Sequence, residues 1–336
     1  RDDAQDRFDR MPRGKMRAKA AEVGETTCRA GDDAQEGRDT VDDAVLDEEA
    51  DRDEDESDEE ENLDMAADEN APAQMQVDFA FFDPRETDFH GVRTLLAGSG
   101  LVPSAWDVGG MAGLIVDQVE VGSMVKTASP DSDAPAEDDV LGFISAINLR
   151  KHRGAKCVQQ ITASVLQRAS DPQGRQAIEK MLDDASQAIA LIVYERMLNM
   201  PPALVPHLLD ALLQDIEWAL TNAPQEERAS FHFTRFFLLA QVTLPAGGAD
   251  ALGSRAGTSL EQRAPGGKKR KKIAAEGQAM LMESLEYFRP EEQLLASSAD
   301  FSVLLNGTGR SRQVLMALTP AALREAIPGL TAMMVE

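Results

Sequence analysis

Residues 139–161 read DVLGFISAINLRKHRGAKCVQQI and combine an apolar run, a basic turn with one glycine and the start of an amphipathic segment. The apolar run predicts a buried strand, and apolar residues at helical spacing predict a helix over 155–168. A strand that enters a helix through a short glycine-bearing loop is a layout in which backbone N–H groups bind anions. The stretch therefore poses two alternatives, a phosphate-binding turn and a structural turn with a basic surface.

The composition of the turn favours the structural alternative. A phosphate loop needs glycines where its backbone must approach the ligand, and Gly154 is the only glycine in RKHRGAK. The basic side chains of Lys151, His152, Arg153 and Lys156 could pair with an anion, with an acidic partner or with the chain's own acidic tail.

Strand-like and helix-like segments alternate outward from this stretch without a strict βαβ rhythm. This pattern predicts an α/β (α+β) domain with a mixed, mostly antiparallel sheet flanked by helices. The segment 279–288 suits either a strand or a helix. The other strands are predicted at 77–83, 119–127, 188–196, 231–245, 301–305 and 313–320, and the other helices at 87–96, 106–118, 173–184, 204–220, 290–300 and from 320.

The charge of the chain is concentrated at its N-terminal end. Residues 1–78 carry 28 acidic and 10 basic side chains, which is −18 of the total net charge of −25. Between residues 42 and 69, 17 of 28 positions are Asp or Glu, and such a charge density prevents collapse. The sequence therefore predicts a disordered acidic tail over 1–75 and a single folded domain over 76–336.

The acidic tail has two readings, a solvating segment and a mobile polyanion that screens Lys and Arg clusters of a partner. The net charge argues against nucleic acid as a direct ligand, because phosphate would be repelled, and favours a basic protein partner. The acidic residues that we expect to meet such a partner are Asp53, Glu54, Asp55, Glu56, Asp58, Glu59, Glu60 and Glu61.

A second charged segment lies in a Gly-, Ala- and Lys-rich stretch at 245–272, which we expect to be a flexible basic loop. Such a basic run favours a nuclear-import signal recognised by an importin, with RNA or the acidic tail in cis as alternatives. The predicted signal comprises Lys268, Lys269, Arg270, Lys271 and Lys272.

No residue set predicts catalysis, a metal site or a membrane span. No apolar run approaches the roughly 18 residues that a span needs, and Cys28 and Cys157 favour a reducing compartment. The segment NGTGRSRQ, which begins at Asn306, predicts a hairpin turn rather than a ligand site. The sequence begins with Arg1 rather than Met, so a targeting segment upstream of it remains an alternative. Four histidines fall in four separate segments: His90, His152, His207 and His232.

Several segments resemble the BCCIP family of eukaryotic nuclear proteins, in the family's order. They are VDFAFFDPRETDFHGVRTLL, VGSMVKT, DVLGFISAINL, GAKCVQQI, YERMLNMPPALVPHLLDAL and the Lys-rich loop ahead of AMLMESLEYF. The resemblance implies a fold like that of the GNAT acetyltransferases without a cofactor or catalysis. It also implies a nuclear chaperone or adaptor, shuttling to the cytoplasm, for a large-subunit ribosomal protein. Links to ribosome biogenesis, nuclear export, protein transport, and cell-cycle and DNA-repair proteins accompany this role.

The resemblance also places an acyl-CoA loop. In GNAT enzymes a strand, loop and helix hold the pyrophosphate of acetyl-CoA, with Gln or Arg, then Gly, then Gly or Ala at set positions. The corresponding residues here would be Lys151, Gly154 and Lys156. A lysine at the last position puts a long side chain where backbone should approach phosphate, so the loop is expected to be degenerate. The alternatives are an N-acetyltransferase that uses acetyl-CoA and a general chaperone of histones or other basic proteins.

Overall fold

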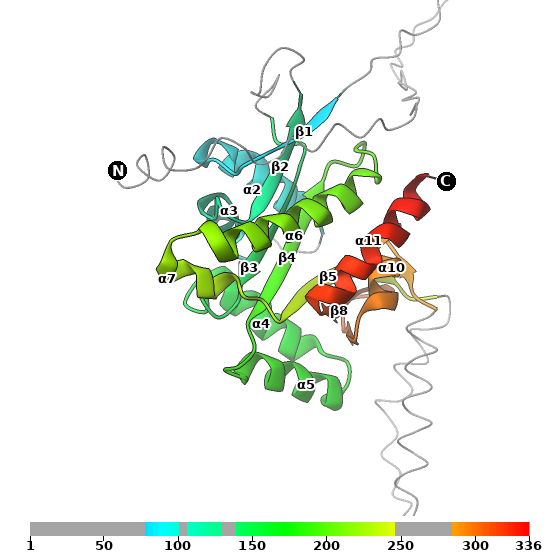
Figure 1. Ribbon diagram of the computed structural model, residues 1–336. Coiled ribbons are helices and arrows are strands. Elements are labelled where there is room, and N and C mark those ends of the chain that lie inside the picture. Colours follow the sequence, from blue (N-terminus) through cyan, green and yellow to red (C-terminus); the bar gives the residue numbers. More distant parts are fainter. Residues whose placement is uncertain (1–77, 101–105, 129–138, 246–283, 336) are drawn as a thin grey trace, which may run out of the picture. The chain divides into compact units, whose positions relative to one another are not determined.

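The computed structural model describes residues 78–100, 106–128, 139–245 and 284–335, which form one eight-stranded sheet with helices on both faces (Figure 1). The expected tail over 1–75 and nearly all of the expected loop at 245–272 lie outside these ranges. The spatial order is β1-β2-β3-β4-β5-β8-β7, and β6 pairs with β5. The strands are β1 Phe79–Phe82, β2 Gly122–Thr127, β3 Gly142–Asn148, β4 Ile189–Arg196, β5 Arg235–Thr243, β6 Glu286–Tyr287, β7 Phe301–Leu305 and β8 Ser311–Leu318.

The described sheet is antiparallel except at its centre, where β4 and β5 are parallel. Antiparallel neighbours need only a turn between them, whereas a parallel pair needs a crossover, and the crossover from β4 to β5 contains helix α6 (Leu204–Asn222). The mixed, mostly antiparallel sheet flanked by helices that the sequence predicts is confirmed.

Two hydrophobic clusters bury the two faces of the sheet. Side chains of a strand alternate between faces, so Ile189 and Leu191 of β4 belong to one cluster and Ala190 and Ile192 to the other. The first face is covered by α2 Phe89–Gly98, α3 Val108–Asp117, α4 Lys156–Arg168 and α5 Pro172–Asp183, and the second by α6, α10 Pro290–Ser298 and α11 Pro320–Val335. Shorter turns are η1 Glu86–Asp88, α7 Gln225–Arg228 and η2 Ala229–Phe231.

Local signals start the helices α3 and α5. The Asp107 carboxylate accepts from Gly110 N–H at 2.9 Å, and the Asp171 carboxylate accepts from Gly174 N–H at 2.6 Å. Each aspartate satisfies a backbone donor that has no partner within the helix. None of the described helices is long and apolar enough to cross a membrane.

The structure defines the secondary structure of three segments for which the sequence predicted a long strand, an ambiguous element and a hairpin. The strand expected over 231–245 begins only at Arg235, because η2 turns the chain just before it. Of the ambiguous segment 279–288, the described part forms the two-residue strand β6. The hairpin expected from Asn306 is confirmed, because β7 and β8 are antiparallel neighbours and Gly309 has the left-handed φ of 56° that this turn uses.

Candidate functional site

The candidate site is the gap that opens between the parallel strands β4 and β5. The two strands pair only from Ile189 to Leu191 and from Arg235 to Phe237, although β4 continues to Arg196 and β5 to Thr243. Backbone groups that face the gap therefore need other partners. Ligands of α/β sheets bind beyond the carboxyl ends of parallel strands, so this gap is where an extended ligand would lie.

The chain fills the far end of the gap with its own strand. β8 pairs with β5 along one edge from Phe236 to Thr243. β6 also pairs with β5, at Val242 and Thr243, and must therefore lie on the opposite edge, which faces β4. The Phe288 N–H donates to the Gln241 carbonyl at 2.9 Å and extends this pairing. An added ligand strand would meet β6 here.

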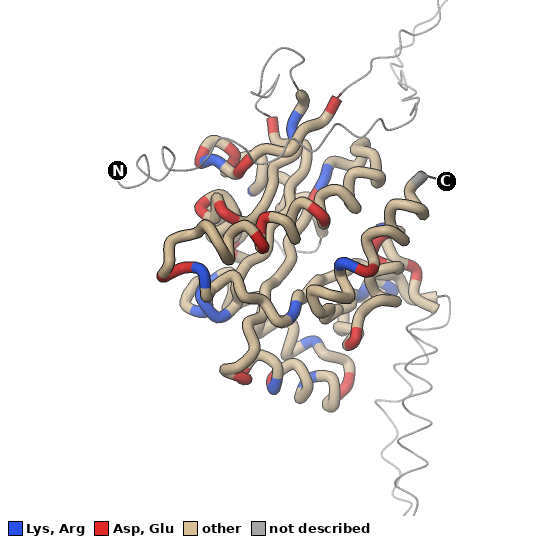
Figure 2. The backbone as a smooth tube through the Cα atoms, in the orientation of Figure 1, with Lys and Arg blue, Asp and Glu red and all other residues tan. Residues whose placement is uncertain are grey.

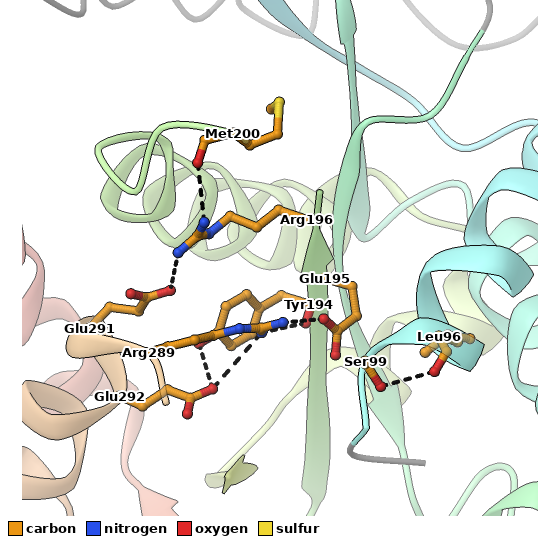
Figure 3. A network of polar contacts seen from close by, with 9 residues as sticks. All are labelled: Leu96, Ser99, Tyr194, Glu195, Arg196, Met200, Arg289, Glu291 and Glu292. Carbon is orange, nitrogen blue, oxygen red and sulfur yellow. Dashed lines mark hydrogen bonds and ion pairs between the residues drawn. The ribbon is translucent and has the colours of Figure 1, made fainter. Parts of the chain in front are cut away.

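Arg289, two residues after the end of β6, spans the rest of the distance to β4 (Figure 3). Its Nη1 donates to the Tyr194 carbonyl at 3.4 Å, and its Nη2 forms an ion pair with the Glu195 carboxylate. The guanidinium also lies over the Tyr194 ring, 5.0 Å from the centroid. A side chain of the protein thus satisfies a backbone carbonyl of β4 and closes the gap.

The first turn of α10 completes this contact with β4. The Tyr194 O–H donates to Glu292 Oε1 at 2.9 Å, and Arg196 Nη2 lies 3.2 Å from Glu291 Oε1. Arg196 Nη1 also donates to the Met200 carbonyl at 3.1 Å. We call Tyr194, Glu195, Arg196, Arg289, Glu291 and Glu292 the polar network; it ties the end of β4 to the start of α10 (Figure 3).

The polar network is buried and has three carboxyl groups for two guanidinium groups. Glu291 and Glu292 are 0% and 1% exposed. Burial raises the pKa of Glu292 to about 8, despite the opposing effect of Arg289. Burial also raises the pKa of Glu195 above its ordinary value, and it outweighs the attraction of Arg289. The excess carboxyl therefore holds a proton more tightly than an exposed one would.

Glu292→Gln is expected to stabilise the domain more at about pH 9 than at about pH 6. The folded state keeps the Glu292 proton up to about pH 8, whereas an unfolded glutamate loses it near the ordinary value of 4.5. The stability that this proton contributes is therefore fully present below pH 4.5, and it is lost as the pH rises through about 8. Glutamine accepts from Tyr194 but cannot ionise.

Urea unfolding of both proteins at the two pH values measures this effect. Glu286→Gln is the matched control, because Glu286 lies on the neighbouring strand β6 and its side chain is 69% exposed. An equal change in unfolding free energy at both pH values for Glu292→Gln would contradict the assignment.

Little free space is left beside the gap. The cavity there has a volume of about 40 Å³ and is lined by residues from α2, α3, α4, β4 and β5, among them Leu96, Met111, Tyr194 and Leu239. That volume accommodates one or a few water molecules and not an acyl-pantetheine arm. No group of His, Cys, Asp and Glu within the described ranges could hold a metal ion.

Lys151, Gly154 and Lys156, the residues of the predicted acyl-CoA loop, lie at the turn that leads into α4, and their assignment to that loop stays a prediction. Their turn lies between β3 and α4, and β3 and β4 are antiparallel neighbours. The helix that crosses between the parallel strands is α6, which follows residues 197–203. Local sequence patterns show where a strand leads into a helix, but they do not show which strand becomes the parallel neighbour.

The basic turn is organised by contacts within the protein. The Asn148 carboxamide oxygen accepts from the N–H groups of Arg150 and Lys151 at 3.0 and 2.9 Å. The Lys151 ammonium lies 3.1 Å from the Glu227 carboxylate and 5.6 Å from the centroid of the Phe231 ring. Burial, with the nearby Lys151 charge, lowers the pKa of His152. These contacts are those of a structural turn.

Gly154→Ala is expected to be neutral or stabilising by up to about 1 kcal/mol. Gly154 has no left-handed φ, and an added Cβ would meet no atom within 4 Å. Gly122→Ala is the contrasting variant, because Gly122 has φ of 138° and its Cβ would lie 2.8 Å from the Ile144 carbonyl. Thermal unfolding compares the two, and an equally large loss for both would show that Gly154 has a constrained role.

The predicted import signal at 268–272 and the acidic residues at 53–61 lie outside the described residues, and both stay predictions. The sequence patterns do not predict the polar network. Glu291 and Glu292 follow Pro290 in a first helical turn, which is typical of a solvated N-terminus. The only available signal was the exclusively apolar run of β4 ending in the charged pair Glu195 and Arg196.

The fold and the site define an α/β protein in which the gap between the two parallel central strands, β4 and β5, is filled by the protein's own residues. The family model for BCCIP matches residues 74–295, and the chain belongs to the BCCIP family. This confirms the resemblance on which the expected GNAT-like fold was based.

Curated relatives share about 30% of aligned residues with this chain. A protein BCCIP homolog of Arabidopsis thaliana is 31% identical over 185 residues, 55% of this chain and 55% of the relative. Protein bcp1 of Schizosaccharomyces pombe is 28% identical over 65% of this chain and 70% of the relative. The human BRCA2 and CDKN1A-interacting protein is 28% identical over 45% and 50%. The chain thus spans about half the length of the plant and human relatives.

Two solved structures align with this chain. The crystal structure of BCP1 from Saccharomyces cerevisiae aligns with a TM-score of 0.52 and 18% identity, over 82% of this chain and 93% of that chain. Arabidopsis thaliana NAA60 in complex with acetyl-CoA aligns with a TM-score of 0.28 and 9% identity, over 72% and 98%. The first alignment supports the fold, and the second is too weak to support acetyl-CoA binding by this chain.

Proposed function

We propose that this protein is a non-enzymatic nuclear chaperone or adaptor for a basic protein client, with a large-subunit ribosomal protein as the first candidate. The observation that carries the proposal is the acidic segment 42–69, in which 17 of 28 residues are Asp or Glu. Membership of the BCCIP family supports a role in protein binding, since two relatives are named for interaction with other proteins. Ribosome biogenesis, nuclear export and protein transport are the processes in which such a client is handled.

The physical task is to keep a basic client soluble before it meets RNA. Free basic extensions attract incorrect polyanionic partners, and a mobile polyanion can screen them while a folded surface holds the globular part of the client. Electrostatic attraction of this kind gives fast association that weakens with salt. The filled gap between β4 and β5 argues against the acetyltransferase alternative, because an acyl-CoA arm would have to displace β6 and Arg289.

The test is association kinetics with a purified large-subunit ribosomal protein. Changing the acidic residues at 53–61 to Asn and Gln should lower the association rate constant by about tenfold or more at low salt and flatten its salt dependence. The matched control exchanges Asp for Glu and Glu for Asp at the same positions and keeps the charge. Unchanged kinetics in the neutralised variant would refute the role of the tail.

Competition with histones tests the second alternative, a general chaperone of histones and other basic proteins. A ribosomal-protein chaperone should retain its client when an equal amount of histone is added, whereas a general chaperone of basic proteins should exchange it. Competition between the two ligands for the purified protein measures this preference.

We further propose that residues 268–272 direct nuclear import through an importin. Alanine at all five positions should reduce nuclear accumulation of a fluorescent fusion. Equal nuclear signal in the variant and the parent would contradict this assignment.

A further inference from the structure

A groove of about 520 Å³ runs between α4, the end of α5 and the start of β4. Figure 1 shows α4 and α5 as neighbouring helices, and both lie in the segment that joins β3 to β4. Adjacent antiparallel strands can be joined by a two-residue turn, so pairing of β3 with β4 does not require residues 149–188. The inserted helices cover one face of the sheet and also form the outer surface that contains the groove.

One face of α4 forms a wall of the groove. Gln159, Thr162, Ala163 and Leu166 recur at spacings of three and four residues and so share a face, and the short Thr162 and Ala163 side chains leave a trough. The distance along the helix from Gln159 to Leu166 is about 10 Å. The remaining apolar lining is Leu149, Val158, Leu182 and Ile189.

Two guanidinium groups stand at the rim of this apolar trough, Arg150 and Arg153. Arg150 Nη2 donates to the Asp184 carbonyl at 2.5 Å, which orients that side chain. Neither arginine forms an ion pair with a described carboxylate within 4.0 Å. Asp183 is the one acidic residue of the lining. Figure 2 shows basic residues along the turn before α4, in a chain whose net charge is −25.

We propose that the α4–α5 groove binds a short segment of a partner protein that carries apolar side chains beside one or more carboxylates. The apolar floor would bury the apolar side chains, and the two guanidinium groups match carboxylates in geometry and charge. A groove this long and open to solvent suits a peptide segment better than a small molecule, which is usually enclosed over most of its surface. This ligand has the opposite charge to the proposed basic client, so the groove would be a second binding site.

The test begins with selection of a random 16-residue peptide library, displayed on phage, against the full chain. We expect enriched peptides to combine Leu, Ile, Val or Phe with Asp or Glu. The most enriched peptide is then synthesised with a fluorophore, and its affinity is measured by anisotropy. Enrichment of basic peptides, or of acidic peptides without apolar residues, would overturn the proposal.

Variants locate the bound peptide. Arg150→Glu with Arg153→Glu should weaken binding at least tenfold, and Ala163→Trp should do so by filling the trough with the charges left in place. The control Arg175→Glu changes an arginine of α5 whose side chain is 56% exposed and which does not line the groove. Unchanged affinity in both groove variants would overturn the proposal, as would displacement of the peptide by micromolar inorganic pyrophosphate. Binding of the basic ribosomal protein should not change in these variants, so failure of the groove and failure of the proposed function can be told apart.

Discussion

Arg289→Ala is expected to destabilise the folded domain by about 3–5 kcal/mol. Arg289 is 9% exposed and contacts Glu195, Glu292 and the Tyr194 carbonyl, so its removal takes the positive charge and the N–H donors away from two buried carboxyl groups and a backbone acceptor. Breaking a buried pair costs more than the pair contributes, because the remaining charge stays desolvated.

The loss of unfolding free energy in Arg289→Ala should be larger at high pH. Glu195 and Glu292 already have raised pKa values because they are buried, and removal of Arg289 takes away an opposing positive charge. Protonation can relieve the variant at low pH but not above the pKa of the two groups. Urea unfolding at about pH 6 and about pH 9 measures the difference.

Arg175→Ala is the matched control for Arg289→Ala. It removes an arginine from an exposed pair with Glu179, at side-chain exposures of 56% and 43%. Such pairs contribute about 0.5 kcal/mol or less. A loss for Arg289→Ala as small as that of Arg175→Ala would show that the polar network does not hold α10 against β4.

Lys126→Met is expected to cost about 3–5 kcal/mol. Lys126 of β2 and Asp88 of η1 form an ion pair, with Nζ and Oδ1 2.6 Å apart and side-chain exposures of 1% and 0%. Methionine has a similar length and keeps the packing, so the loss reports the unpaired Asp88 charge rather than a cavity. Asp88 also accepts from the Arg85 N–H at 2.8 Å and therefore holds the chain between β1 and α2.

A second substitution separates charge from packing. Asp88→Asn keeps an acceptor for the Arg85 N–H and removes the charge, so adding it to Lys126→Met should recover part of the lost stability. Denaturant unfolding of both single variants and the double variant gives the coupling energy. Additive losses would contradict a buried ion pair as the cause.

Burial was easier to predict from the sequence than pairing. The apolar run before Tyr194 predicts a buried strand, and the spacing of Val158, Ile161 and Val165 predicts α4, because local patterns report which side chains avoid water. Parallel pairing of β4 with β5 depends on a crossover that the same patterns do not define. The turn before α4, to which the resemblance assigns the acyl-CoA loop, joins antiparallel neighbours, whereas the crossover between the parallel strands begins at residues 197–203.

The polar network lay beyond prediction for a related reason. Arg289 and Glu195 are 94 residues apart in sequence, and charged residues after a short strand or in a first helical turn normally face water. Only the gap between β4 and β5 makes them core residues, because its backbone groups need partners that β6 and Arg289 provide.

Calorimetric titration of the full chain with acetyl-CoA tests the central claim that the protein's own residues occupy this gap. A closed gap predicts no saturable heat of binding at ligand concentrations up to about 1 mM, where even weak binding would be seen. Saturable binding of one acetyl-CoA per chain at micromolar concentration would contradict the claim and support the acetyltransferase alternative.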